Sequence, residues 1–205
     1  SMSEQVRAGT LKLNDFFEAE SSMHRSHGSC MTMGTASTMA CMVEALGIGL
    51  PGNATFPAVD GRRNVLARDS GRRIVEMVHT DQTISKVLTR EAFENATSVI
   101  MAVGGSTNSV LHLLAVARTA GVPLSIDDFE SIRQRVPVIC DLKPSGRYVT
   151  VDLHQAGGIP QVMKLLLDAD LLHGDCQTIE GKTLKQLLAD VPSVPPAGQD
   201  VIRPL

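Results

Sequence analysis

The chain of 205 residues has few aromatic side chains, no long apolar run and no excess of basic residues. It contains no tryptophan, one tyrosine and five phenylalanines. Its longest apolar stretches, such as Val162 to Leu167 with Lys164 in the middle, fall far short of the roughly 18 residues that a membrane-spanning helix requires. Nineteen lysines and arginines stand against 22 aspartates and glutamates, which gives a net charge of −3. We therefore expect no membrane span and no nucleic-acid partner.

Closely spaced cysteine pairs are also missing. The four cysteines, Cys30, Cys41, Cys140 and Cys176, contain no C-x-x-C pair, so no zinc ribbon or ferredoxin-type run is encoded locally. The first residues do not have the pattern of a signal peptide. Since disulfides belong to oxidising compartments, we expect reduced thiols and a cytoplasmic protein.

The composition that is present, 43% apolar and 20% charged residues, is typical of a folded globular domain. Met39, Met42, Val43 and Leu46 recur at helical spacing and predict one helix face. Further helices are expected over residues 10–23, 60–78, 91–103, 110–117, 125–135, 159–167 and 183–190. The short apolar run at 138–140 indicates a strand, and a second strand is expected at 177–179. The prediction is an α/β fold, a helix-rich layered domain with a small, largely parallel sheet.

A loop rich in small residues from Gly28 to Gly34 precedes the helix that carries Met39. The free amide groups at a helix start stabilise an anion or a thiolate, so Cys30 is a candidate metal ligand or nucleophile. The alternative is a buried structural cysteine beside a tight turn, and the residues alone slightly favour it. His24 and His27 lie nearby, but two histidines do not complete a metal site, and a polar loop pair is the favoured interpretation.

A second glycine-rich turn, Gly104 to Asn108, leads into the apolar segment 110–117. Ser106 is placed to cap that helix, and such a helix start can hold phosphates or carboxylates. The turn lacks the lysine of a P-loop and the spacing of a dinucleotide-binding loop. Because residues 110–117 are apolar almost all round, we expect a buried helix with His112 as a core histidine.

Six sequence blocks, in chain order, resemble those of one protein family. They are Gly28 to Met39, Glu44 to Gly52, Ala92 to Ala96, Gly104 to Asn108, Asp141 to Gly146 and Leu171 to Cys176. The resemblance is to the dihydroxy-acid and sugar-acid dehydratases, which remove water from 2,3-dihydroxy acids with an iron-sulfur cluster. It covers nearly all of this chain but about the middle third of a family enzyme.

The resemblance implies that Cys30 is one of three cysteines that ligate the cluster. The segment with the other two, the magnesium ligands and the serine that acts as base in relatives have no counterpart in this sequence. An iron-sulfur cluster (2Fe-2S or 4Fe-4S) and magnesium are thus expected in the full-length family and not in this chain. No catalytic residue is assigned, and Ser106, Thr107 and Asn108 are interpreted as a substrate or support loop, with support favoured.

The sequence therefore predicts a fragment of a dihydroxy-acid dehydratase of branched-chain amino acid biosynthesis, inactive alone and self-associating into a homo-oligomer. Residues 1–190 are expected to form the central part of the N-terminal α/β domain. Residues 191–205, with Pro192, Pro195 and Pro196, are expected to be a linker toward a missing C-terminal domain. The alternatives are a fragment of a sugar-acid dehydratase, to which residues 31–39 are at least as similar, and a non-catalytic self-associating module.

Overall fold

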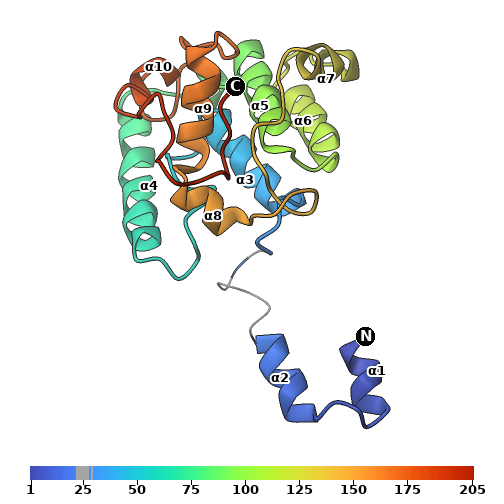
Figure 1. Cartoon of the computed structure of the whole chain (residues 1–205). Helices are drawn as coiled ribbons and strands as arrows, with labels where there is room; N and C mark the ends of the chain where they lie inside the picture. The colour runs from blue at the N-terminus through green and yellow to red at the C-terminus, as the bar shows by residue number, and fades with distance from the viewer. Residues whose placement is uncertain (22–27, 29) are drawn as a thin grey trace.

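The structure is a computed structural model that describes residues 1–21, 28 and 30–205, and the regular structure of these residues is helical (Figure 1). The elements are α1 (Met2–Arg7), α2 (Leu13–Ser21), α3 (Thr35–Ala45), α4 (Arg62–His79), η1 (Ile84–Lys86), α5 (Arg90–Val103), α6 (Asn108–Thr119), α7 (Ile126–Arg133), α8 (Thr150–Gln155), α9 (Gly158–Asp168) and α10 (Leu184–Leu187). Within these residues, no helix combines the length and apolarity needed to cross a bilayer.

The prediction of an α/β fold with a small, largely parallel sheet is wrong, because no strand forms in the described part of the chain. The run 138–140 makes a single bridge, between Cys140 and Ile202, and the run 177–179 another, between Gln177 and Thr183. The backbone amides of Ile139 and Cys140 both donate to the carbonyl of Ala102 at the end of α5, at 2.9 and 3.1 Å. These two amides, which in a strand would form hydrogen bonds to a neighbouring strand, therefore bind the end of a helix.

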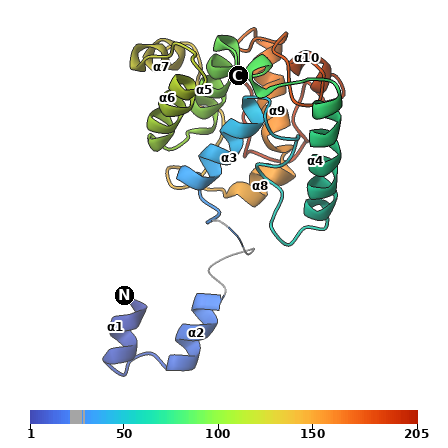
Figure 2. The same cartoon turned by 180° about the vertical axis from the view of Figure 1, so that it is seen from behind.

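Helix α5 lies at the centre of the core and contacts α3, α7 and α9. The two views place α4 at one edge of this helical body and α6 and α7 at the other (Figures 1 and 2). Ten of the 14 residues of α5 are buried, and Phe93 is fully buried. Thr89 caps its start by accepting from the amide of Ala92, and Gly104 ends it in the left-handed conformation, at φ 63°.

Helix α6 is an outer helix, which corrects the prediction of an all-round buried one. Its buried residues, Ser109, Leu113 and Ala117, lie four apart on one face. Leu111 is 68% exposed, and His112 is exposed as well, so its interpretation as a core histidine is wrong. Because Ser109 and Ala117 are small, these three residues give the helix a narrow buried face, and larger apolar residues outside that face, such as Leu111, remain in contact with solvent.

The last part of the chain packs on the body through two buried residues, Val201 and Ile202. The amide of Asp141 donates to the carbonyl of Val201 at 2.9 Å, and the amide of Arg203 donates to the carbonyl of Ile139 at 2.8 Å. Residues 139–141 and 201–203 are thus held side by side. The division of the chain at residue 190 stays a prediction.

Candidate functional site

The loop that carries Cys30 is anchored immediately beyond that residue. The amide of Met33 donates to the carbonyl of Lys143 at 2.7 Å, and the amide of Thr150 donates to the carbonyl of Met31 at 2.8 Å. The Thr150 hydroxyl also contacts the Met31 sulfur at 3.3 Å. Two residues next to or near Cys30 are therefore held by one distant segment, residues 143–150.

Cys30 is an exposed, free thiol just before α3. Its sulfur lies 3.3 Å from the Thr32 hydroxyl, and its carbonyl accepts from the Ser37 hydroxyl at 3.4 Å. The start of α3 has no side-chain cap, because its N-cap residue is Gly34. The exposure contradicts the interpretation of Cys30 as a buried structural cysteine. His24 and His27 lie outside the described residues.

The other three cysteines are poor ligands in this fold. Cys41 and Cys140 are buried, and burial raises the pKa of both thiols, that of Cys140 to about 12. Cys176 is half-buried, and desolvation raises its pKa to about 11. With these raised pKa values the three thiols stay protonated at neutral pH. Metals bind the thiolate form, so these cysteines are packing residues rather than ligands. In the part of the chain that the structure describes, no three His, Cys, Asp or Glu side chains group as a metal site.

The second predicted loop, Ser106 to Asn108, forms the start of α6. The N-cap position is occupied by Thr107, whose side chain makes no cap hydrogen bond. Ser106 nevertheless accepts from the amide of Asn108 at 3.3 Å, which satisfies one of the free amides of the helix start. The Ser106 hydroxyl therefore does bind a free amide of the helix start, as expected, but Ser106 lies one residue before the N-cap position.

Hydroxyl groups join the start of α6 to the start of α3. The Thr35 hydroxyl accepts from the Asn108 side-chain amide at 2.9 Å and lies 3.3 Å from the Ser106 hydroxyl. The Ser106 amide donates to the Thr38 hydroxyl at 3.0 Å. A Cβ on Gly105 would lie 2.7 Å from a Thr38 methyl, so only glycine permits this approach. The two loops that the sequence singles out are thus neighbours.

We call the region built by residues 30–35, 105–108 and 141–150 the Cys30 corner. It presents one exposed thiol beside the starts of α3 and α6, which is a suitable setting for a negatively charged, soft-ligand group. Cys30 therefore fits the role of one thiolate ligand of an iron-sulfur cluster. A complete set of ligands is not contained in the described residues.

Sequence reasoning missed the structural importance of Glu44, which is 2% exposed at the end of α3. Its carboxylate accepts from the amides of Gly52 and Ala54 at 2.8 and 3.0 Å, and it fixes the loop that follows α3. Burial raises its pKa to about 7, against the two hydrogen bonds that lower it. A single acidic residue inside an apolar helical run is the signal that would have identified it.

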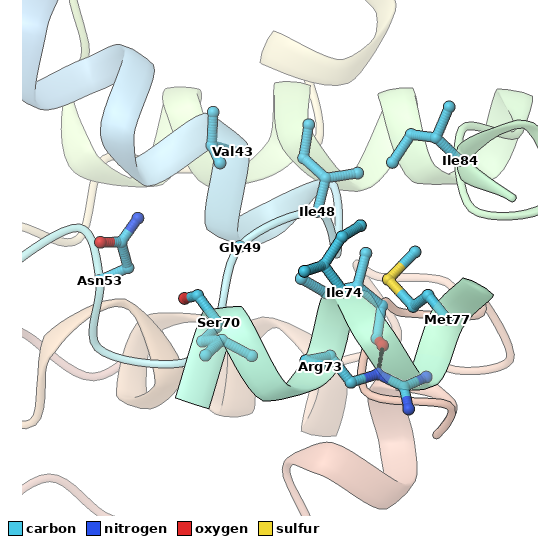
Figure 3. A pocket seen from close by; sticks show the side chains of 11 residues that line it. Val43, Ile48, Gly49, Asn53, Ser70, Arg73, Ile74, Met77 and Ile84 are labelled. Atoms are coloured by element: carbon cyan, nitrogen blue, oxygen red, sulfur yellow. Dashed lines mark hydrogen bonds between the residues drawn. The ribbon is translucent and has the colours of Figure 1, made fainter. Parts of the chain in front are cut away.

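A cavity of about 300 Å³ lies between the end of α3 and α4 (Figure 3), and its lining residues are different from those of the Cys30 corner. Its walls are largely apolar and include Val43, Ile48 and Met77. The guanidinium of Arg73 is already engaged, because it donates to the carbonyl of Ile179 and to the side chain of Gln82. The cavity therefore offers neither a metal ligand set nor an acid-base pair.

Comparison with known proteins places these features in a family context. Residues 1–187 match the family model described as dihydroxy-acid/6-phosphogluconate dehydratase, N-terminal. A protein named dihydroxy-acid dehydratase from Synechococcus sp. (strain RCC307) is 62% identical over 201 residues, which are 98% of this chain and 36% of that protein. The protein of the same name from Synechococcus sp. (strain CC9605) is 69% identical over 178 residues, which are 87% of this chain and 32% of that protein. The dihydroxy-acid dehydratase from Chloroflexus aggregans (strain MD-66 / DSM 9485) is 57% identical over 200 residues, which are 98% of this chain and 36% of that protein. The chain spans about a third of the length of these curated relatives.

Proposed function

The chain belongs to the dihydroxy-acid/6-phosphogluconate dehydratase family, and from this premise we propose that it is part of a dihydroxy-acid dehydratase. The reaction would convert a 2,3-dihydroxy acid into a 2-keto acid and water, as a step of branched-chain amino acid biosynthesis. The observation that carries the proposal is the match of 98% of this chain, at 62% identity, to a protein of that name. The three relatives described above share that name, which favours the dihydroxy-acid reaction over the sugar-acid alternative.

We propose that Cys30 is a thiolate ligand of an iron-sulfur cluster. A bound cluster would supply an iron that binds the departing hydroxyl as a Lewis acid. The contribution of this chain would be to hold the Cys30 sulfur at the start of α3, where the helix amides favour negative charge. The remaining thiolates, the magnesium ligands and the base would come from those parts of the relatives that this chain does not span.

For Ser106, Thr107 and Asn108 we propose a supporting role. Ser106 and Asn108 both hydrogen-bond the Thr35 hydroxyl, at the first residue of α3. Their polar groups are thereby used to fix the helix that follows Cys30. Thr107 is exposed beside them.

We further propose a cytoplasmic homo-oligomer, with residues 1–190 as part of one domain and 191–205 as a linker to another. The outer face of α4 supports self-association, because Val75 and Val78 are 55% and 73% exposed there. Sedimentation of the protein over a range of concentrations tests the oligomer.

The test of the proposed function compares this chain alone with the longest natural protein that contains it. Both are reconstituted anaerobically with iron and sulfide, followed by visible absorption, and assayed with 2,3-dihydroxyisovalerate and with a sugar acid. We expect the longer protein to bind the cluster and dehydrate 2,3-dihydroxyisovalerate, and the chain alone to do neither. Turnover of the sugar acid alone would support the alternative substrate class.

The matched pair of variants is Cys30→Ser and Cys176→Ser in the longer protein. Cys30→Ser should lose the cluster absorption and the activity, whereas Cys176→Ser should keep both, because Cys176 is a half-buried packing residue. A Cys30→Ser protein with its cluster and activity intact would disprove the ligand assignment. Absence of a cluster and of turnover in the longer protein would favour the non-catalytic module.

A further inference from the structure

We propose that Asp141 is a positioning residue for Cys30: it fixes the turn 141–148, and the backbone of this turn holds the loop that carries the thiol. The inference rests on the proposed function of Cys30 as a cluster ligand.

The Asp141 carboxylate is the hub of a network of charged groups. Its side chain is 10% exposed, and one oxygen accepts from Arg147 Nε at 2.5 Å and lies 3.1 Å from Arg203 Nη2. The other oxygen accepts from the backbone amide of Arg147 at 3.3 Å. The hydrogen bond from the Arg147 side chain is the main reason that the pKa of Asp141 is lowered. The carboxylate therefore stays charged at neutral pH and holds both arginines.

The backbone of the turn closes tightly around this carboxylate. The amide of Tyr148 donates to the Asp141 carbonyl at 3.0 Å, and the amide of Lys143 donates to the Tyr148 carbonyl at 2.7 Å. A Cβ on Gly146 would lie 2.4 Å from both the carbonyl carbon and a carboxylate oxygen of Asp141. Only glycine fits there, so the path of the turn and the position of the Asp141 side chain determine each other.

The turn is connected to the Cys30 loop by a hydrogen bond to the Lys143 carbonyl. That carbonyl accepts from the amide of Met33, and the amide of Thr150, two residues beyond the turn, donates to the carbonyl of Met31. Cys30 is bonded directly to Met31 in the chain. A displacement of the turn therefore displaces the residue that carries the thiol.

Residues 200–203 contact the Asp141 network from the other side. Arg203 pairs with Asp141, and Arg147 also donates to Asp200 at 2.6 Å. The Asp141 amide donates to the carbonyl of Val201, which is buried. Asp141 thus connects residues 200–203 to the Cys30 loop.

The first experiment measures hydrogen exchange of single amides in Asp141→Asn, which keeps the shape of the side chain and removes its charge. We expect the amides of Met33 and Thr150 to exchange about tenfold faster, because their acceptor segments are no longer fixed. The amide of Phe93, in α5, should exchange as in the wild type. A merely structural effect would instead accelerate all three amides together, and that outcome would overturn the proposal.

The matched control is Glu130→Gln, which also removes the charge of a carboxylate paired with an arginine, Arg133 at 2.6 Å. It should leave the Met33 and Thr150 amides unchanged. If Asp141→Asn folds poorly, Arg203→Gln replaces it, since Asp141 then keeps Arg147, and we expect a smaller acceleration at the same two amides. If the Met33 and Thr150 amides exchange within about twofold of the wild-type rates in every folded variant of Asp141 and Arg203, the proposal is also overturned.

The second experiment follows the cluster itself in the longer protein, as loss of visible absorption in the presence of a ferrous chelator. Asp141→Asn should release iron several times faster than the wild type and Glu130→Gln, and equal release rates would overturn the link to the cluster ligand. A wild-type protein that takes up no cluster would disprove the proposed function. In that case accelerated exchange at Met33 and Thr150 would still support the control of the Cys30 loop by Asp141.

Discussion

Helices α4 and α5 differ in how the chain specifies them. Among the 18 residues of α4 only Met77 is buried, whereas α5 buries ten of its 14 residues. The ion pairs of α4 join near neighbours, such as Arg68 with Asp69 and Arg73 with Glu76. Its longer-range hydrogen bonds come from arginine side chains, such as that of Arg73 to the Ile179 carbonyl. On α5, by contrast, the buried side chain of Asn95 bonds the backbone of His173, far along the chain. Burial against distant segments thus specifies α5, whereas α4 depends more on local ion pairs and on contacts made from its surface.

The largest expected difference between the two helices comes from truncation of one side chain on each. Phe93→Ala should lower the free energy of unfolding by about 3–5 kcal/mol, because it opens a cavity in the core. Val78→Ala, at a 73% exposed position of α4, should change it by less than about 0.5 kcal/mol when measured on the dissociated chain, at protein concentrations too low for the proposed self-association. Urea denaturation of both variants measures the difference. Equal losses would show that the outer face of α4 is also packed.

The buried carboxyl of Glu44 predicts a pH dependence of stability. Its folded-state pKa of about 7 lies above the ordinary value of 4.5, so the folded chain holds a proton that the unfolded chain releases. The contribution to stability is therefore complete below pH 4.5 and is lost as the pH rises through 7, by at most about 3 kcal/mol. Glu44→Gln should abolish this slope.

The measurement is the free energy of unfolding of wild type and Glu44→Gln between pH 5 and 7.5. Glu130→Gln is the control, because Arg133 lowers the pKa of Glu130 to about 2 and its contribution is constant over this range. His154 has a lowered pKa, mainly through burial, and works in the opposite direction. It is common to all three proteins, so it cancels in the differences. Parallel curves for wild type and Glu44→Gln would contradict the prediction.

A smaller effect is expected where α3 meets α6. Thr35→Val removes the acceptor of the Asn108 amide and the partner of the Ser106 hydroxyl, and should cost about 1 kcal/mol. Thr35→Ser keeps the hydroxyl and should restore most of the loss. Thermal unfolding of the pair checks this, and a loss in Thr35→Ser without a loss in Thr35→Val would mean that the methyl group, rather than the hydroxyl, joins the helices.

The smallest effect is a gain on α4. A Cβ on Gly71 would meet no atom within 4 Å, so Gly71→Ala should stabilise the protein by about 0.5–1 kcal/mol through helix propensity. The same change at Gly105 should destabilise it, because that Cβ would lie 2.7 Å from Thr38. Thermal midpoints that fall for Gly71→Ala would show that α4 is covered by another surface.

Sequence reasoning could find the helix that follows Cys30 and the two loops at helix starts, because both depend on residues close together in the chain. It could not bring the loops together, because the bond between Thr35 and Ser106 spans 71 residues. The role of Asp141 was hidden for a related reason. The turn that it fixes holds the Cys30 loop through backbone groups of Lys143 and Met33, and backbone contacts leave no residue pattern.

The two errors of fold have separate physical causes. Residues 138–140 have the apolar character of a strand, but Val138 is 62% exposed and the next two amides bind the end of α5. The segment 110–117 is apolar on every side, so its composition cannot show which side faces the core. Ser109, a polar residue just outside that segment, marks the buried face together with Leu113 and Ala117.

The anchoring of Met31 by Thr150 also sets an order of events during synthesis of the protein. The two residues are 119 positions apart, so the Cys30 loop cannot take its final position until the chain as far as α8 has left the ribosome. Helices α3, α5 and α6 can associate earlier, since their sequence lies between the two. A nascent chain would therefore carry Cys30 on an unanchored loop beside a core that is already forming.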